Sequence, residues 1–101
     1  MKIVRGVLST QLQLDTVKIL ETNVDDVSGE VLGNMIEKIM AYGAKDVTIS
    51  SAITKKGRPT NLVSVICDSD TMNSIMDLLV TETGTLGVRV RTSQRYMEPR
   101  L

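Results

Sequence analysis

The sequence contains no histidine, tryptophan or phenylalanine, and only one cysteine and two tyrosines among its 101 residues. Without histidine, a preformed transition-metal site built from His and Cys ligands is excluded, so a metal must be held by carboxylates or by the ligand itself. The single cysteine, Cys67, cannot form an internal disulfide, which fits a reducing cytoplasmic setting. The shortage of aromatic rings also removes the stacking platforms that single-strand nucleic-acid binders use.

Neither sign of charge is in excess, because twelve Lys and Arg balance twelve Asp and Glu. A general nucleic-acid binder needs surplus cations to neutralise phosphates, so the balance argues against nucleic acid as a partner. The apolar runs are too short to span a membrane, and Met1–Arg5 does not lead into a secretory signal. We therefore expect a cytoplasmic domain that uses neither a membrane nor a nucleic acid.

Apolar periodicity organises the chain from residue 16 onward. We expect a lead-in over residues 1–15, as an extra edge strand or a linker, then one domain over 16–96 and a tail over 97–101. Strands are predicted over residues 17–21, 47–53, 62–67 and 86–91. Helical spacing predicts two helices, with stripes made of Val31, Leu32, Met35, Ile36, Ile39 and Met40, and of Met72, Ile75, Met76, Leu79 and Val80.

The helix ends carry their own signals. Asp25 or Asp26 is expected to cap the first helix, and Asp68 or Asp70 to begin the second. Two glycines, Gly43 and Gly84, are placed to end them. Cys67 falls within a predicted strand and is interpreted as a core residue.

The resulting order, β-α-β-β-α-β, predicts an α+β ferredoxin-like sandwich. Right-handed crossovers give an antiparallel sheet of strand order 4-1-3-2 with two helices on one face. The strands over 17–21 and 62–67 carry apolar residues on both faces, and two helices cover only one of them. An uncovered apolar face is typical of a contact surface, so we expect a homo-oligomer, a trimer or hexamer, or docking to another domain.

The same topology brings three polar connections to one end of the sheet. An acidic loop over 23–30 carries carboxylates of the kind that hold Mg²⁺ or Mn²⁺ against phosphate oxygens. A basic turn over 55–59 carries cations that can grip a triphosphate. A loop over 81–87, followed by a strand arginine, offers hydroxyls and backbone N–H groups for phosphate or ribose. The candidate residues are Asp25, Asp26 and Glu30, then Lys55, Lys56 and Arg58, then Thr83, Thr85 and Arg89.

Each group alone also has a plain structural interpretation. An aspartate caps a helix without any ligand, a Gly-Pro turn is solvated, and a glycine ends a helix before a strand. Charged residues on an edge strand discourage aggregation. The convergence of the three groups is what favours a site for a metal-bound nucleotide.

Three runs resemble motifs of the C-terminal region of the LarC nickel-insertion family. They are LETNVDDVSGEVLG over 20–33, KKGRP over 55–59 and ETGTLGVR over 82–89, in the family's order and across most of 16–94. The resemblance implies nickel insertion into pyridinium-3,5-bisthiocarboxylic acid mononucleotide, which completes the nickel-pincer nucleotide of lactate racemase and related enzymes. It also implies consumption of CTP with a divalent metal, so the expected activity is that of a CTP-dependent nickel chelatase of the lyase type.

The resemblance also implies roles for the candidate residues. The carboxylates of Asp25, Asp26 and Glu30 would be metal ligands or catalytic groups, and the three cations of the 55–59 turn would contact the CTP phosphates. Thr83, Thr85 and Arg89 would line the same pocket. The family's long N-terminal region lies outside this sequence, and we expect full activity to require it as a partner.

Two other functions fit the same plan. A non-catalytic ACT-like module would sense small ligands at subunit interfaces without a divalent metal. The fold alone does not distinguish this function from nucleotide binding. An RNA-binding domain of this topology is disfavoured by the missing strand aromatics and the zero net charge.

Overall fold

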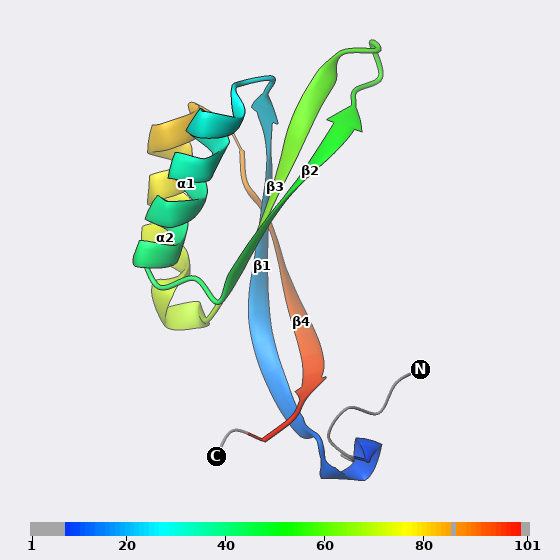
Figure 1. Cartoon of the computed structure of the whole chain (residues 1–101). Coiled ribbons are helices and arrows are strands. Elements are labelled where there is room, and N and C mark those ends of the chain that lie inside the picture. The colour runs from blue at the N-terminus through cyan, green and yellow to red at the C-terminus, as the bar shows by residue number, and fades with distance from the viewer. Residues whose placement is uncertain (1–7, 86, 100–101) are drawn as a thin grey trace.

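The computed structural model describes residues 8–85 and 87–99 (Figure 1). A short 3-10 helix, η1, precedes four strands and two helices. Their bounds are η1 Ser9–Gln11, β1 Gln13–Asp25, α1 Gly29–Ala41, β2 Asp46–Ile53, β3 Pro59–Cys67, α2 Ser69–Thr83 and β4 Arg89–Met97. The strands form one sheet in the order β2-β3-β1-β4, with every neighbouring pair antiparallel. Both helices lie on one face, so the predicted ferredoxin-like sandwich is confirmed.

The core lies between the two helices and the facing side of the sheet. Strand residues alternate between the two faces, whereas helix residues spaced three or four apart share one face. Side chains from both layers are therefore completely enclosed, at 0% exposure: Leu20, Val63, Val65, Cys67, Ile39, Ile75 and Leu79. Burial of each large aliphatic side chain stabilises the fold by about 1.5–3 kcal/mol. The interpretation of Cys67 as a core residue is confirmed.

One predicted helix start is wrong. Ser28 caps α1, and its hydroxyl oxygen accepts a hydrogen bond from the Val31 N–H at 3.3 Å. Asp25 is instead the last residue of β1, which runs well past residue 21 because it pairs with β3 as far as Thr60. The prediction at the end of α2 is confirmed, since Gly84 caps it with a φ of 68°.

The outer strand is also displaced from its predicted position. β4 covers Arg89–Met97 rather than residues 86–91, and residue 86 lies outside the described part of the chain. The Gln13–Val17 part of β1 pairs with Ser93–Met97 of β4 and with no other described strand. These segments form a ribbon that projects beyond the helices (Figure 1). The ribbon mixes polar side chains with Leu14, Val17, Tyr96 and Met97 in no regular alternation. Its sequence therefore does not predict a strand, and the pairing with β4 defines it.

The face of the sheet opposite the helices carries both apolar and charged side chains. Ile19 and Ile66 are cross-strand partners on that face, with Leu62 further along β3, and all three are only partly buried. Arg91 forms an ion pair with Glu21 beside them. In the described residues, neither helix is long and apolar enough to cross a membrane.

Candidate functional site

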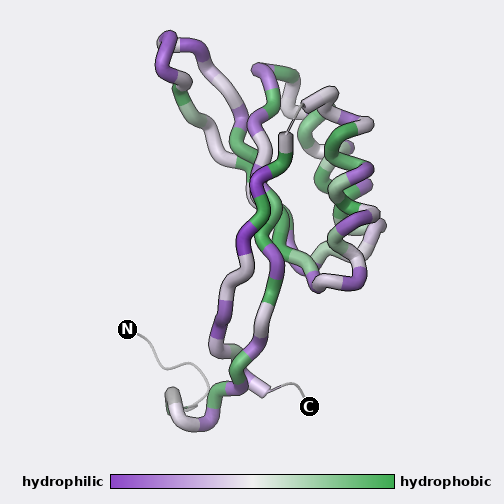
Figure 2. Tube along the Cα trace, turned by 180° about the vertical axis from the view of Figure 1, so that it is seen from behind, coloured by the Kyte–Doolittle hydropathy of each residue, from purple (hydrophilic) through white to green (hydrophobic). Residues whose placement is uncertain are grey.

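Three connections lie at one end of the sheet, as the topology predicts. They are the β1–α1 loop, the β2–β3 hairpin and the segment that follows α2 (Figure 1). The hairpin extends beyond the body of the domain, and its tip is among the most hydrophilic segments of the chain (Figure 2). The end of the sheet therefore presents acidic, basic and hydroxyl-bearing segments together.

The acidic loop presents three exposed carboxylates. Asp25 ends β1, Asp26 follows it, and Glu30 lies in the first turn of α1. The ion pairs within the described residues use other carboxylates, at Asp15, Glu21, Asp68 and Glu82. The three loop carboxylates are thus open to an incoming cation.

These carboxylates do not form a complete metal site by themselves. Over residues 8–85 and 87–99, no three Cys, Asp or Glu side chains stand together so as to hold a metal ion. Mg²⁺ and similar ions are commonly bound by one or two carboxylates, with water and substrate phosphates as the remaining ligands. The donor set fits a metal that arrives with a phosphate ligand, and the metal-binding role of Asp25, Asp26 and Glu30 stays a prediction.

The hairpin tip carries three exposed cations. Lys55, Lys56 and Arg58 surround Gly57, which adopts a φ of 74°. The turn is closed by two backbone bonds of 2.9 Å, from Thr54 N–H to the Arg58 carbonyl and from Gly57 N–H to the Thr54 carbonyl. Like charges this close repel one another, so an anion bound between them lowers the energy of the tip.

The segment after α2 is organised by threonine hydroxyls. Thr83 donates to the Leu79 carbonyl at 2.7 Å and accepts from the Thr85 N–H at 3.1 Å. The Thr85 hydroxyl donates to the Gly87 carbonyl at 3.0 Å and accepts from the Gly87 N–H at 3.3 Å. Both hydroxyls predicted to meet a ligand are therefore already engaged within the loop, where they shape its backbone.

Arg89 connects two of the three segments. Its Nη2 donates to Asn23 Oδ1 at 3.1 Å, which ties the first residue of β4 to the residue that begins the acidic loop. Sequence reasoning placed Arg89 near the site but missed this contact. The two residues are 66 positions apart, and only the strand register brings them together.

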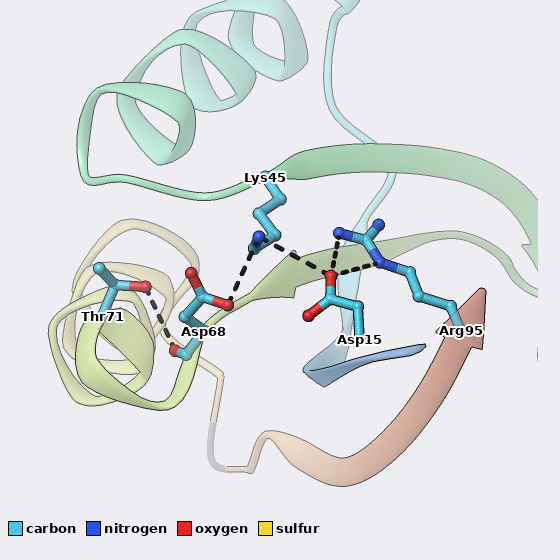
Figure 3. Close-up of polar contacts among 5 residues, drawn as sticks. All are labelled: Asp15, Lys45, Asp68, Thr71 and Arg95. Atoms are coloured by element: carbon cyan, nitrogen blue, oxygen red, sulfur yellow. Dashed lines mark hydrogen bonds and ion pairs between the residues drawn. The ribbon is translucent and has the colours of Figure 1, made fainter. Parts of the chain in front are cut away.

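A second charged cluster was not predicted, and its side chains are drawn in Figure 3. It lies near the start of β1 and of β2, away from the three connections. The Asp15 carboxylate accepts from Arg95 Nε at 3.1 Å and lies 4.0 Å from Lys45 Nζ, which in turn lies 3.5 Å from Asp68. The cluster borders a cavity of about 390 Å³. It joins the ribbon to the start of β2 and to α2, and its charges are mutually paired.

Comparison with known proteins identifies the family. A family model described as nickel insertion protein matches residues 1–101. The chain belongs to this family. Relatives that carry the nickel-insertion name include a protein of Methanothermobacter thermautotrophicus, 52% identical over 90 residues, which are 89% of this chain and 21% of the relative. Another, from Methanosphaera stadtmanae, is 54% identical over 76 residues, or 75% of this chain and 19% of the relative. The chain thus spans about a fifth of the length of these curated relatives.

Solved structures agree with the motif resemblance. The chain is similar to LarC2, described as the C-terminal domain of a cyclometallase involved in the synthesis of the NPN cofactor of lactate racemase. The identity is 35%, the TM-score is 0.76, and the match covers 82% of this chain and 58% of that one. A PII-like signaling protein of Thermus thermophilus, at 17% identity and a TM-score of 0.58 over 83% of this chain and 90% of that one, shares the fold alone. The chain therefore corresponds to the C-terminal domain of the LarC family.

Proposed function

We propose that this chain is the CTP- and divalent-metal-binding part of a nickel-insertion cyclometallase. The whole enzyme would metallate pyridinium-3,5-bisthiocarboxylic acid mononucleotide in the cytoplasm and make the nickel-pincer nucleotide of lactate racemase-like enzymes. One observation carries the proposal: exposed carboxylates on the β1–α1 loop and exposed cations on the β2–β3 hairpin share one end of the sheet.

The charges at this end complement a metal-bound triphosphate. Asp25, Asp26 and Glu30 would attract Mn²⁺ or Mg²⁺, whose other ligands would be phosphate oxygens and water. The negative phosphate charge that the metal does not neutralise would be neutralised by Lys55, Lys56 and Arg58. Arg58 is suited to bidentate contacts with phosphate. Thr83 and Thr85 would hold the backbone of the segment after α2 in place. Arg89, through its hydrogen bond with Asn23, would hold the start of β4 against the acidic loop.

Nickel is the inserted ion in this proposal and needs no soft-ligand cage in the chain. The sequence has no histidine, and the one thiol, Cys67, is 0% exposed. The sulfurs and a ring carbon of the pyridinium substrate would supply the nickel ligands. Full activity would require the N-terminal region of the family as a partner, because this chain spans about a fifth of its relatives.

The open sheet face supports a further part of the proposal, assembly of a trimer or hexamer. Ile19, Leu62 and Ile66 stand on the face that neither helix covers. A partly apolar face beside the Arg91–Glu21 ion pair is suited to contact with a second copy.

Calorimetric titration of the purified chain with CTP tests the function directly. We expect binding that requires Mn²⁺, prefers CTP over ATP and is lost in Asp26→Ala. Asp77→Ala is the matched control, because Asp77 is an exposed aspartate on α2. Failure of the folded wild-type chain to bind CTP with Mn²⁺ would contradict the proposal. Metal-independent binding of an amino acid would instead support the ACT-like alternative.

A further inference from the structure

The described part of the chain buries three polar side chains. They are Thr22, Thr60 and Asn61, with exposed fractions of 0%, 7% and 8%. A buried polar group costs free energy unless it is hydrogen-bonded, and all of these are bonded. Their bonds all go to the connections that form the candidate site.

Thr22 reaches from the core side of β1 to the segment after α2. Its hydroxyl lies 2.9 Å from Thr85 Oγ1 and 3.0 Å from the Gly87 carbonyl oxygen. With the bond between Thr85 and Gly87, these three oxygens form a closed triangle. A valine in place of Thr22 would suit the core between Leu20 and Val24, so the hydroxyl serves the loop rather than the core.

Thr60 and Asn61 make the corresponding connection for the other two segments. They follow directly after the basic hairpin tip, on β3. Thr60 Oγ1 donates to the Val24 carbonyl at 3.0 Å, and Asn61 Nδ2 donates to the Asp25 carbonyl at 3.3 Å. The base of the hairpin is thus fastened to the backbone where the acidic loop begins.

We propose that Thr22, Thr60 and Asn61 form a positioning clamp that fixes the mutual placement of the three ligand-binding segments. The proposal rests on the nucleotide-binding function above, since the placement matters for a ligand that spans the segments. None of the three residues touches the ligand in this proposal. Thr22 is the most informative member because it contacts Thr85 and Gly87 through a hydroxyl that the isosteric change to valine removes.

The test compares Thr22→Val, which removes the hydroxyl, with Thr22→Ser, which keeps it. Ile39→Val is the control for a small loss of core packing, because Ile39 is 0% exposed on α1 and its aliphatic side chain carries no hydrogen-bonding atom. Amide hydrogen exchange of Thr85 and Gly87 is measured in the free protein, and CTP affinity is measured with Mn²⁺.

We expect Thr22→Val to speed exchange at Gly87 and to weaken CTP binding, each about tenfold, the effect of one hydrogen bond. Thr22→Ser should keep both values within about twofold of wild type, as should Ile39→Val. Unchanged amide exchange in Thr22→Val overturns the clamp, whether or not the wild-type chain binds CTP. Failure of the wild-type chain to bind CTP refutes only the nucleotide-binding function. Faster exchange with unchanged CTP affinity overturns the positioning role.

Discussion

Removing the cations of the hairpin tip should weaken CTP binding without unfolding the domain. The perturbation is the triple variant Lys55→Ala, Lys56→Ala and Arg58→Ala, with Gly57 kept because its φ of 74° shapes the turn. All three side chains are exposed, and the turn is closed by backbone bonds. The unfolding free energy should therefore change by no more than about 0.5 kcal/mol.

The expected loss of affinity follows from the exposure of the tip. An exposed charge pair is typically worth about 0.2–1 kcal/mol because water and salt screen it. Three such contacts with a triphosphate add up to roughly 1–2 kcal/mol, which corresponds to a loss of about five- to thirtyfold in affinity. CMP carries fewer phosphate groups, so its affinity should change much less.

Calorimetry with CTP and CMP at two salt concentrations measures these effects. The wild-type affinity for CTP should fall more steeply with salt than that of the triple variant, because fewer screened contacts remain in the variant. Lys38→Ala removes an exposed cation of α1 and should leave both affinities unchanged. An equal loss for CTP and CMP, or no loss for either, would refute the assignment of the tip to the phosphates.

Three further predictions concern the fold. Leu20→Ala, at 0% exposure, should lower the unfolding free energy by about 2–5 kcal/mol in urea titration, whereas Leu14→Ala, at 54% exposure, should have a far smaller effect. Gly84→Ala should cost about 1 kcal/mol purely from the backbone, because φ is 68° and nothing lies within 4 Å of the added Cβ; an unchanged urea midpoint would argue against the left-handed cap. Burial raises the pKa of the Cys67 thiol above 9.0. A hydrogen bond with Thr71 lowers the pKa, and the nearby charges of Asp68 and Asp70 raise it, so that folding favours the neutral thiol. Its stabilising contribution should be intact below pH 9 and lost as pH rises through the folded-state pKa, and Cys67→Ala, measured by urea titration across this range, should remove that part of the pH dependence.

The candidate site was predicted at the level of its loops but not of its contacts. The topology alone brings the acidic loop, the basic hairpin and the threonine-glycine segment to one end of the sheet. The residue roles inferred from the family motifs stay predictions. The contacts of Thr22 and Arg89 were missed because each partner is more than sixty residues away along the chain.

Local physical chemistry in the sequence determined the architecture. Apolar stripes such as those holding Ile39 and Ile75 specify helices that must bury one side, and Gly84 specifies a helix end that other residues adopt only with strain. The β-α-β-β-α-β order with right-handed crossovers then leaves one strand order. None of these features depends on a distant partner.

Only the tertiary structure decided how far the strands extend and which polar groups meet. β1 continues to Asp25 because β3 offers backbone partners as far as Thr60, and this moves the helix cap from the aspartates to Ser28. Pairing with β4 likewise makes a strand of the segment from Gln13, which has no regular apolar alternation. Hydrogen bonds between strands and between buried side chains depend on the register of strand pairing. Local sequence patterns do not specify which residues of two distant strands lie opposite each other.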